Sequence, residues 1–233
     1  MTLTLPSTIA IDGPAGSGKS SVSFAVAQRI NYLFVDTGAF YRAVTFLALE
    51  QALDLHDAAQ LVALCEQTHF DMTPDRKDDG RQFTFLANER DITQDLNTPQ
   101  VDKAVSIVAA TPEVRASVLE AQRLLAKKGR VIMAGRDIGT VVLPNADLKI
   151  YIDASLEKRA ERRHKQRRDN GEQADYEAIL ANLRERDRLD SSRDTAPLLQ
   201  ADDAIKLDTS DLTFDATIEA AYTLIANWTP SAT

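Results

Sequence analysis

The stretch IAIDGPAGSGKSS, residues 9–21, is an apolar run that breaks into glycines and ends in a lysine and two serines. Its residues 13–20, GPAGSGKS, fit the phosphate-binding pattern G-x-x-x-x-G-K-[ST]. The flanking residues predict a buried strand over Ile9–Ile11 and a helix over Lys19–Ile30. A glycine-rich loop that leads into a helix N-terminus forms an anion site. This stretch therefore predicts a loop that binds the phosphates of a nucleoside triphosphate.

The residues of this loop match the chemistry of phosphate binding. Glycines let the backbone fold closely around phosphate oxygens, so that several N–H groups point inward. Lys19 places a positive charge at the outer phosphates, and the Ser20 hydroxyl can ligate Mg²⁺. The residues expected to bind the triphosphate are Gly13, Pro14, Ala15, Gly16, Ser17, Gly18, Lys19, Ser20 and Ser21.

The composition is that of an ordinary globular protein. The chain has 233 residues, 44% hydrophobic and 27% charged, and this length suits one good-sized domain or a domain with an insertion. The net charge of −8 argues against a general nucleic-acid-binding surface, and the single Cys65 excludes an internal disulfide and a cysteine-rich zinc site. No apolar run approaches the ~18 residues that span a bilayer. We therefore expect a cytoplasmic monomer without a nucleic-acid or membrane partner.

Apolar runs alternate with amphipathic helical stretches along most of the chain. This alternation is typical of an α/β fold, in which helices cover a parallel sheet. The sheet is expected to have five strands: Ile9–Ile11, Leu33–Val35, Val131–Met133, Lys149–Ile152 and Ala204–Leu207. Further helices are expected over Phe40–Leu53, Val114–Lys128 and Thr213–Asn227. Thr111-Pro112-Glu113 is a helix-start sequence, with a capping threonine and a proline at the first helical position.

Two segments interrupt this alternation. From His69 to Asp95 the hydrophobic pattern has a period of two on both sides of the polar turn PDRKDDGR, residues 74–81, which predicts a β-hairpin and a short third strand. From Arg159 to Gln173 the chain is strongly basic and helix-like. We expect a β-rich insert over residues 66–98, a helical lid over about residues 157–173, and a core formed by residues 1–65 and 99–233.

Arginines mark where an acceptor phosphate would bind. A phosphate monoester is already anionic near neutral pH, because its second pKa is about 6, so such an acceptor needs cations more than a base. Arginine grips phosphate through two parallel hydrogen bonds. Arg42 and Arg136 each follow the end of an expected strand, at the edge of the sheet where ligands bind. The other candidate arginines lie later in the chain: Arg159, Arg163, Arg186 and Arg193.

Four segments together resemble the bacterial cytidylate kinases: DGPAGSGKS (12–20), VDTGAFYR (35–42), AGRDIGTVVLP (134–144) and RERDRLDSSRDTAPL (184–198). The resemblance covers nearly the whole chain in the right order. The phosphate loop is shared by many families, but GRDIGTVV combined with RERD and the insert is far more specific. The resemblance implies a P-loop kinase that phosphorylates CMP and dCMP with ATP and Mg²⁺, and it makes the insert an enlarged nucleotide-monophosphate domain.

The resemblance also implies roles for matching residues. The implied catalytic residues are Lys19, Arg42 and Arg136, to which the basic lid adds Arg159 and Arg163. The implied contacts to CMP are Thr37, Arg42, Arg136 and Arg193 at the phosphate, Ser106, Arg115 and Asp137 at the cytosine, and Arg186 and Asp190 at the ribose. Ser20 would ligate Mg²⁺, while Asp36 would either orient its waters or cap the helix that follows.

Hydrogen-bond chemistry supports the implied choice of base. Cytosine presents an N4 amino donor beside its N3 acceptor, and uracil reverses both. Acceptors such as Asp137 and Ser106 facing N4, with the Arg115 guanidinium facing N3, would select cytosine. The alternative for Ser106 is a hydrogen bond to the preceding helical turn.

Other functions share the phosphate loop. A GTP-dependent switch would need an Asn-Lys-x-Asp signature, and the sequence contains none. Another small P-loop kinase would lack the GRDIGT and RERD pair and the β-rich insert. A non-catalytic ATP-binding regulator could keep the loop without a set of arginines for an acceptor phosphate. The other kinase would phosphorylate a different acceptor, and the regulator would phosphorylate none.

Overall fold

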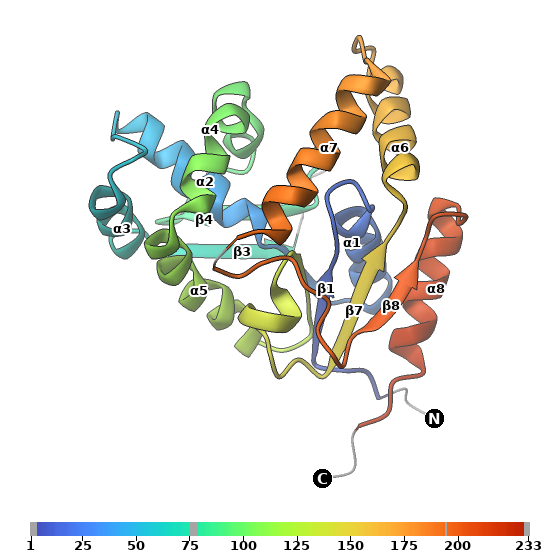
Figure 1. Ribbon diagram of the computed structural model, residues 1–233. Helices are drawn as coiled ribbons and strands as arrows, with labels where there is room; N and C mark the ends of the chain where they lie inside the picture. Colours follow the sequence, from blue (N-terminus) through green and yellow to red (C-terminus); the bar gives the residue numbers. More distant parts are fainter. Residues whose placement is uncertain (1–3, 75–78, 194, 231–233) are drawn as a thin grey trace. The chain divides into compact units, whose positions relative to one another are not determined.

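The apolar runs form a five-stranded parallel sheet with strand order β2-β6-β1-β7-β8 in the computed structural model, which describes residues 4–74, 79–193 and 195–230 (Figure 1). Its strands are β1 (Thr8–Asp12), β2 (Leu33–Asp36), β6 (Val131–Gly135), β7 (Leu148–Asp153) and β8 (Ile205–Asp208). Each expected strand is present, with small shifts at its ends. The α/β fold class predicted from the sequence is confirmed.

The chain divides into two compact units. We call residues Met1–Asn31 with Ile132–Thr233 the loop unit, because it contains the phosphate loop, and Tyr32–Val131 the insert unit. The division predicted from the sequence, with an insert over residues 66–98, stays a prediction. Among the described residues, no helix combines the length and apolar character needed to cross a bilayer.

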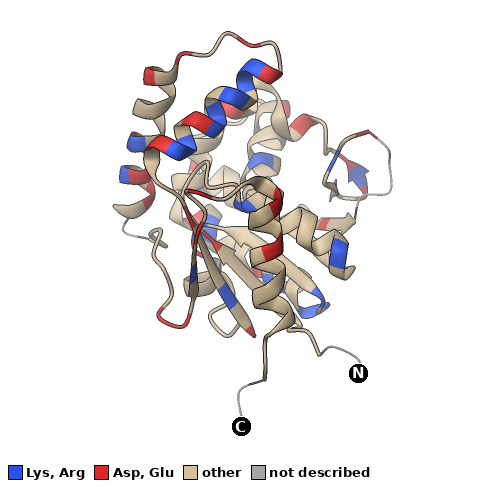
Figure 2. Ribbon diagram, turned by 90° about the vertical axis from the view of Figure 1, so that its right-hand side faces the viewer, with Lys and Arg blue, Asp and Glu red and all other residues tan. Residues whose placement is uncertain are grey.

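In the loop unit, parallel pairing brings β1 beside β7 and β7 beside β8, with Ile9 opposite Leu148 and Asp12 opposite Tyr151. Helix α1 packs against α8, and α6 packs against α7 (Figure 1). Basic and acidic residues follow each other along α6, so this helix is not uniformly basic (Figure 2). The helices are α1 (Lys19–Ile30), α6 (Leu156–Asp169), α7 (Tyr176–Ser191), α8 (Phe214–Ala226) and a short π-helix, η2 (Ile138–Val142).

The insert unit contains a small antiparallel sheet of order β3-β4-β5. Phe70 and Met72 alternate with polar residues on β3 and lie opposite Ala87 and Phe85 of β4. The Phe40 ring of α2 meets Phe85 edge to face, with the ring centroids 5.1 Å apart, so the hairpin packs on that helix. The elements are α2 (Gly38–Glu50), α3 (Ala58–Glu66), β3 (Phe70–Pro74), β4 (Phe83–Ala87), β5 (Arg90–Asp91), the 3₁₀ turn η1 (Asp95–Asn97), α4 (Pro99–Ala110) and α5 (Pro112–Lys127).

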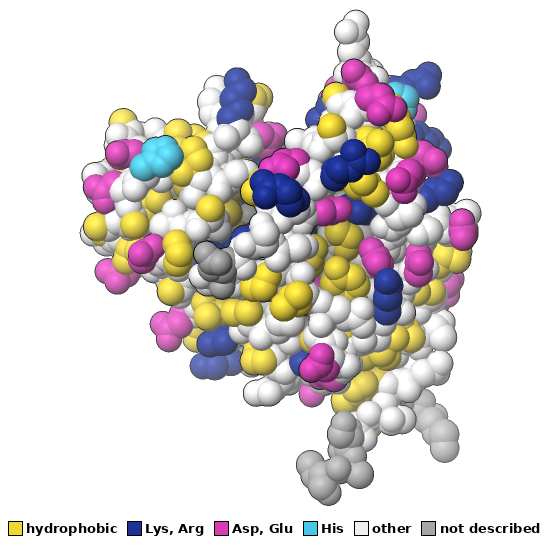
Figure 3. Space-filling view, in the orientation of Figure 1, with side chains coloured by type: hydrophobic (Ala, Val, Ile, Leu, Met, Phe, Trp, Pro, Cys, Tyr) yellow, Lys and Arg dark blue, Asp and Glu magenta, His cyan; other side chains and the backbone are white. Residues whose placement is uncertain are grey.

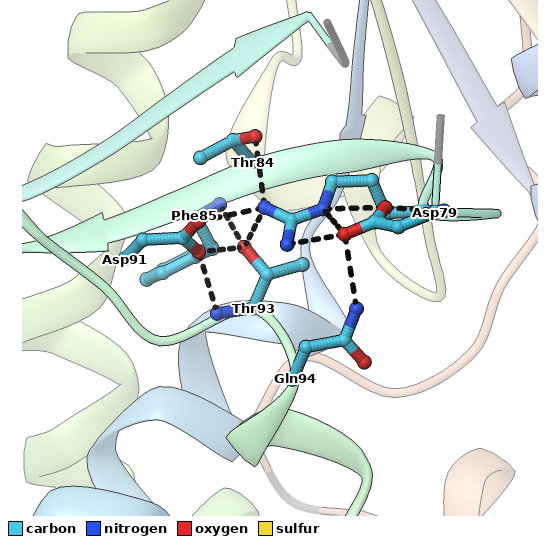
Figure 4. Close-up of polar contacts among 7 residues, drawn as sticks. Asp79, Thr84, Phe85, Asp91, Thr93 and Gln94 are labelled. Atoms are coloured by element: carbon cyan, nitrogen blue, oxygen red, sulfur yellow. Dashed lines mark hydrogen bonds and ion pairs between the residues drawn. The ribbon is translucent and has the colours of Figure 1, made fainter. Parts of the chain in front are cut away.

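The predicted hairpin and third short strand are confirmed, and Arg81 ties them together. Its guanidinium pairs with Asp79 at 2.7 Å and with Asp91 at 2.8 Å, while the Thr93 hydroxyl accepts both from Arg81 and from the Phe85 N–H (Figure 4). The charged groups of the insert therefore satisfy one another locally. Residues 75–78 of the predicted turn lie outside the described residues.

The predicted helix start at Thr111 is confirmed in position but not in its cap. Helix α5 begins at Pro112, with Thr111 at the N-cap position. The Thr111 hydroxyl does not accept from the new helix. It donates to the Ile107 carbonyl at 3.2 Å, because Thr111 directly follows α4 and its hydroxyl reaches back to the last turn of that helix.

Candidate active site

The phosphate loop is shaped by glycines in the left-handed region and by a folded-back lysine. Gly16 and Gly18 have φ of 76° and 86°, and Gly18 is the N-cap of α1 without any side-chain cap. Lys19 is buried, and its Nζ donates to the Pro14 carbonyl at 3.2 Å. The Ser17 hydroxyl is buried without a hydrogen-bond partner among the described residues. These are the features of a loop shaped to receive an anion at a helix N-terminus.

Asp12, at the end of β1, binds the turn that follows β6. Its carboxylate accepts from the Ile138 N–H at 2.8 Å and from the Gly139 N–H at 2.7 Å. Burial raises the pKa of Asp12 to about 6; these two hydrogen bonds and the charge of Lys19 act in the opposite direction, whereas the charge of Asp137 adds to the rise. Asp137 is itself buried. A buried carboxylate thus lies between the phosphate loop and the GRDIGT segment.

Asp190 brings together two of the predicted phosphate-binding arginines. The Arg136 Nε donates to one Asp190 oxygen at 2.8 Å, and Arg193 pairs with the other oxygen. The side chains of both arginines are mostly buried. The predicted ribose contact Arg186 is exposed on α7, one turn before Asp190. The carboxylate therefore orients two guanidinium groups just beyond the end of β6.

The predicted lid pair, Arg159 and Arg163, differs in burial. Arg159 is 5% exposed, and its two terminal nitrogens meet the Asp187 carboxylate at 3.0 and 2.7 Å. The same guanidinium donates to the Ala15 carbonyl of the phosphate loop at 3.0 Å. Arg163 is exposed on α6. Basic and acidic side chains are interspersed over the part of the surface that α6 and α7 form (Figure 3). Arg159 therefore connects α6, α7 and the phosphate loop, whereas Arg163 faces solvent.

In the insert unit, Arg42 is oriented by α4 and by the turn before it. Its Nη1 donates to the Leu96 carbonyl at 2.9 Å and to the Asp102 carboxylate at 2.7 Å. Thr37 is buried at the N-cap position of α2. The Asp36 carboxylate accepts from the Gly38 N–H at 2.9 Å, so its helix-capping alternative is present in the structure.

The two predicted base-reading residues of the insert unit lie on adjacent helices. Ser106 is exposed on α4, and Arg115 is buried on α5. The Arg115 guanidinium donates to the Ala109 carbonyl at 3.3 Å and lies 5.3 Å from the centre of the Tyr41 ring. The aromatic ring and the carbonyl orient the guanidinium, which a group that reads a base requires.

The model of the cytidylate kinase family matches residues 9–227. The chain belongs to this family. A cytidylate kinase of Herpetosiphon aurantiacus is 46% identical over 224 residues, which cover 96% of each chain, and one of Bacillus licheniformis is 45% identical over 217 residues, covering 93% of this chain and 95% of the relative. A solved structure of shikimate kinase from Bacteroides thetaiotaomicron is 10% identical, with a TM-score of 0.47 over 93% of this chain and 97% of that one.

Three carboxylates that contact the candidate site of this cytidylate kinase family member were not predicted from the sequence: Asp12, Asp102 and Asp187. Each orients a predicted group from a different element, so no local motif contains both partners. A signal existed for Asp12, because a carboxylate at the end of an apolar strand run needs a buried partner. Asp187 lies inside the quoted RERD segment, where it could have been paired with a basic residue of the lid.

Proposed function

We propose that this member of the cytidylate kinase family transfers the γ-phosphoryl group of ATP to CMP and dCMP, giving CDP and dCDP. The observation that carries this proposal is the Asp190-bound pair Arg136 and Arg193, in the same unit as the phosphate loop. Strands β1 and β6 are neighbours in the sheet, so the segments after both begin at the same edge. An arginine pair at this edge suits a second phosphate rather than water as the acceptor.

In the proposed reaction, a phosphate oxygen of CMP forms the new P–O bond while the bond between the γ-phosphorus and the bridging oxygen of ATP breaks. Lys19 neutralises the outer phosphates of ATP. Arg42, Arg136 and Arg193, with the Thr37 hydroxyl, bind the acceptor phosphate and offset its repulsion from the γ-phosphate. Arg163 adds positive charge from the lid when it closes, because closure excludes water and strengthens the attraction.

Mg²⁺ fits this site as an ion shared with the substrate. Among the described residues no group of three or more His, Cys, Asp or Glu side chains could hold a metal by itself. Mg²⁺ at such sites takes one or two protein ligands and completes its shell with phosphate oxygens and water. The Ser20 hydroxyl, in the first turn of α1, would be the protein ligand, and Asp36 would orient bound water. The ion supplies charge neutralisation at the phosphates.

Base choice depends on Asp137, Ser106 and Arg115 in this proposal. Asp137 and Ser106 accept from the N4 amino group of cytosine, and Arg115 donates to N3. Arg186 and Asp190 contact the ribose, and the Asp190 carboxylate can accept a hydroxyl while it binds arginines, because each oxygen has two lone pairs. The proposal also retains a monomeric state, which gel filtration tests, and a cytoplasmic location, which cell fractionation tests.

The decisive experiment separates products chromatographically after incubation of the purified protein with Mg²⁺, ATP and one monophosphate at a time. We expect rapid conversion of CMP and dCMP and slow conversion of UMP and AMP. Faster turnover of AMP or of a sugar acid would assign the chain to another small P-loop kinase. ATP binding without transfer to any acceptor would favour a regulator.

The control for this experiment is Lys19→Ala. Losing a transition-state contact of this kind costs roughly 3 kcal/mol, so kcat should fall by about two orders of magnitude while the circular dichroism spectrum stays unchanged. A folded Lys19→Ala protein with the kcat of the wild type would remove the phosphate loop from the proposed mechanism.

A further inference from the structure

Asp12 stands at the junction of two segments of the loop unit. It is the last residue of β1 and directly precedes the phosphate loop. Its Oδ1 accepts from the Ile138 N–H and its Oδ2 from the Gly139 N–H, at 2.8 and 2.7 Å. These N–H groups follow directly after Arg136 and Asp137. One carboxylate thus connects the phosphate loop with the turn that carries two proposed CMP contacts.

The turn after β6 relies on this carboxylate for its cap. The first N–H groups of any helix have no partner inside it, and a side chain at the N-cap position usually supplies one. Asp137 occupies the N-cap position of η2 but makes no side-chain cap. The cap comes from Asp12, which lies 126 residues before Ile138 in the sequence. A single π-helical turn is uncommon and is frequent at functional sites, so its position beside the phosphate loop is informative.

Capping alone would not require an ionised, buried group. Asp12 is 5% exposed, and the titratable groups that face it are Asp137 from the turn, Lys19 from α1 and Tyr151 from β7. A serine or asparagine could accept from one N–H without the desolvation of a charge. A carboxylate accepts from both N–H groups at once and so fixes the direction of the turn as well as its position.

We infer that Asp12 is a positioning residue for the acceptor nucleotide: by binding the Ile138 and Gly139 N–H groups, it holds Arg136 and Asp137 in register with the phosphate loop. This inference rests on the proposed function. The inference predicts that Asp12 affects mainly the binding of CMP and the preference for CMP over UMP, although Asp12 lies next to the phosphate loop in the sequence.

The test is Asp12→Asn, whose side chain keeps one acceptor oxygen and turns an amide donor toward the second N–H. Misplacing a positioned group by about 1 Å can lower rates roughly a hundredfold. We expect kcat/KM for CMP to fall about tenfold to a hundredfold, the KM for CMP to rise and the preference for CMP over UMP to shrink. The KM for ATP should stay within about threefold of the wild type. Hydrogen exchange of the Ile138 and Gly139 amides should become faster.

The matched control is Asp147→Asn, at the other end of β1. The Asp147 carboxylate also accepts from a backbone N–H, that of Thr8, at 2.8 Å. This contact is exposed, and Thr8 begins β1, whereas the phosphate loop follows the other end of that strand. This variant should keep the kcat/KM of the wild type for CMP. A wild-type protein that does not phosphorylate CMP would refute the proposed function. A CMP-active wild type with an equally active Asp12→Asn, or a loss confined to the KM for ATP, would overturn only the present inference.

Gly139→Ala provides a second variant if Asp12→Asn does not fold. A Cβ at position 139 would lie 3.3 Å from the Asp12 Oδ2 and 3.0 Å from the Lys149 Cδ, so the contact must shift although the carboxylate remains. We expect a smaller loss of kcat/KM for CMP in the same direction, of several-fold to about tenfold. Faster hydrogen exchange of the residue 139 amide would show that the contact with Asp12 is weakened. If folded Gly139→Ala showed this faster exchange and kept the kinetics of the wild type, the contact would not matter for catalysis and the inference would be overturned.

Discussion

The carboxylates that orient proposed CMP contacts differ in exposure between the loop unit and the insert unit. In the loop unit, Asp12 is 5% exposed and the side chain of Asp190 is 15% exposed, and both bind groups that flank the end of β6. In the insert unit, Arg42 is oriented by Asp102, whose side chain is 56% exposed. Buried hydrogen-bonded charges fix geometry firmly, whereas exposed pairs are weakened by water and salt. We therefore expect Arg136 to be held firmly in the loop unit and Arg42 to be more adaptable in the insert unit.

The largest expected effect separates base reading by Asp137 of the loop unit from phosphate binding by Arg42 of the insert unit. Uracil would place its O4 against Asp137 and leave buried polar groups unpaired, and a hydrogen-bonding site can reject such an analogue by about 10⁴-fold. Asp137→Ala should lose most activity toward CMP and most of the preference for CMP over UMP. Arg42→Ala should lose activity and keep the preference, since a phosphate contact does not read the base.

The measurement is kcat/KM for CMP and UMP in the wild type and in both variants. If Asp137→Ala kept the preference, or if the wild type used UMP within a few-fold of CMP, the base-reading assignment would be wrong. Loss of the preference in Arg42→Ala would contradict the assignment of Arg42 to the phosphate alone.

The second prediction concerns the buried and exposed arginines of α6. Arg159→Ala leaves Asp187 without its bidentate partner and removes the hydrogen bond to Ala15. The free energy of unfolding should therefore fall by about 3 to 4 kcal/mol. Arg163→Ala should leave the unfolding free energy within about 0.5 kcal/mol and lower kcat. Urea unfolding and steady-state kinetics of both variants measure this. Equal stability of the two would contradict a structural role for Arg159.

The third prediction tests how much stability the loop unit gives up to bury Asp12. Its pKa is about 6 in the folded protein against 3.8 as the ordinary value, so between these values the folded state binds more protons than the unfolded chain. The contribution of this group to the unfolding free energy therefore falls as the pH rises from about 4 to about 7, by about 3 kcal/mol. The difference in unfolding free energy between the wild type and Asp12→Asn should change by this amount. A pH-independent difference would place the folded pKa near its ordinary value.

The sequence predicted the elements whose signals are local, and it missed the contacts that bind distant segments. Helix α1 begins and ends where predicted, because the glycine loop and the apolar pattern lie within a few residues of it. Arg159 was predicted as a mobile lid residue because its neighbours are basic. Its partner Asp187 lies 28 residues later, and only the packing of α6 on α7 brings the two together. The same holds for Asp12, whose partners are 126 and 127 residues away.

The sequence predicted Asp190 as a ribose contact but did not predict its pairing with arginines, for the same reason. Its pairing with Arg193 is local, but its pairing with Arg136 spans 54 residues. The sequence placed Arg136 beyond the end of a strand and Arg193 in the RERDRLDSSR segment, without indicating that one carboxylate orients both. The candidate site residues were thus recognisable as chemical types, while their mutual support depended on tertiary structure.

The smallest expected effect compares the carboxylates that orient Arg42 and Arg136. Asp102→Ala removes an exposed partner, and such pairs contribute roughly 0.2–1 kcal/mol, so kcat/KM for CMP should fall by no more than about fivefold. The Leu96 carbonyl still accepts from Arg42 in this variant. Asp190→Ala removes a mostly buried partner shared by Arg136 and Arg193, and should lower kcat/KM much further. The loss in Asp102→Ala should also shrink at high salt, because screening already weakens that pair in the wild type. An Asp102→Ala protein as impaired as Asp190→Ala, at both low and high salt, would show that the insert unit holds its arginine as firmly as the loop unit does.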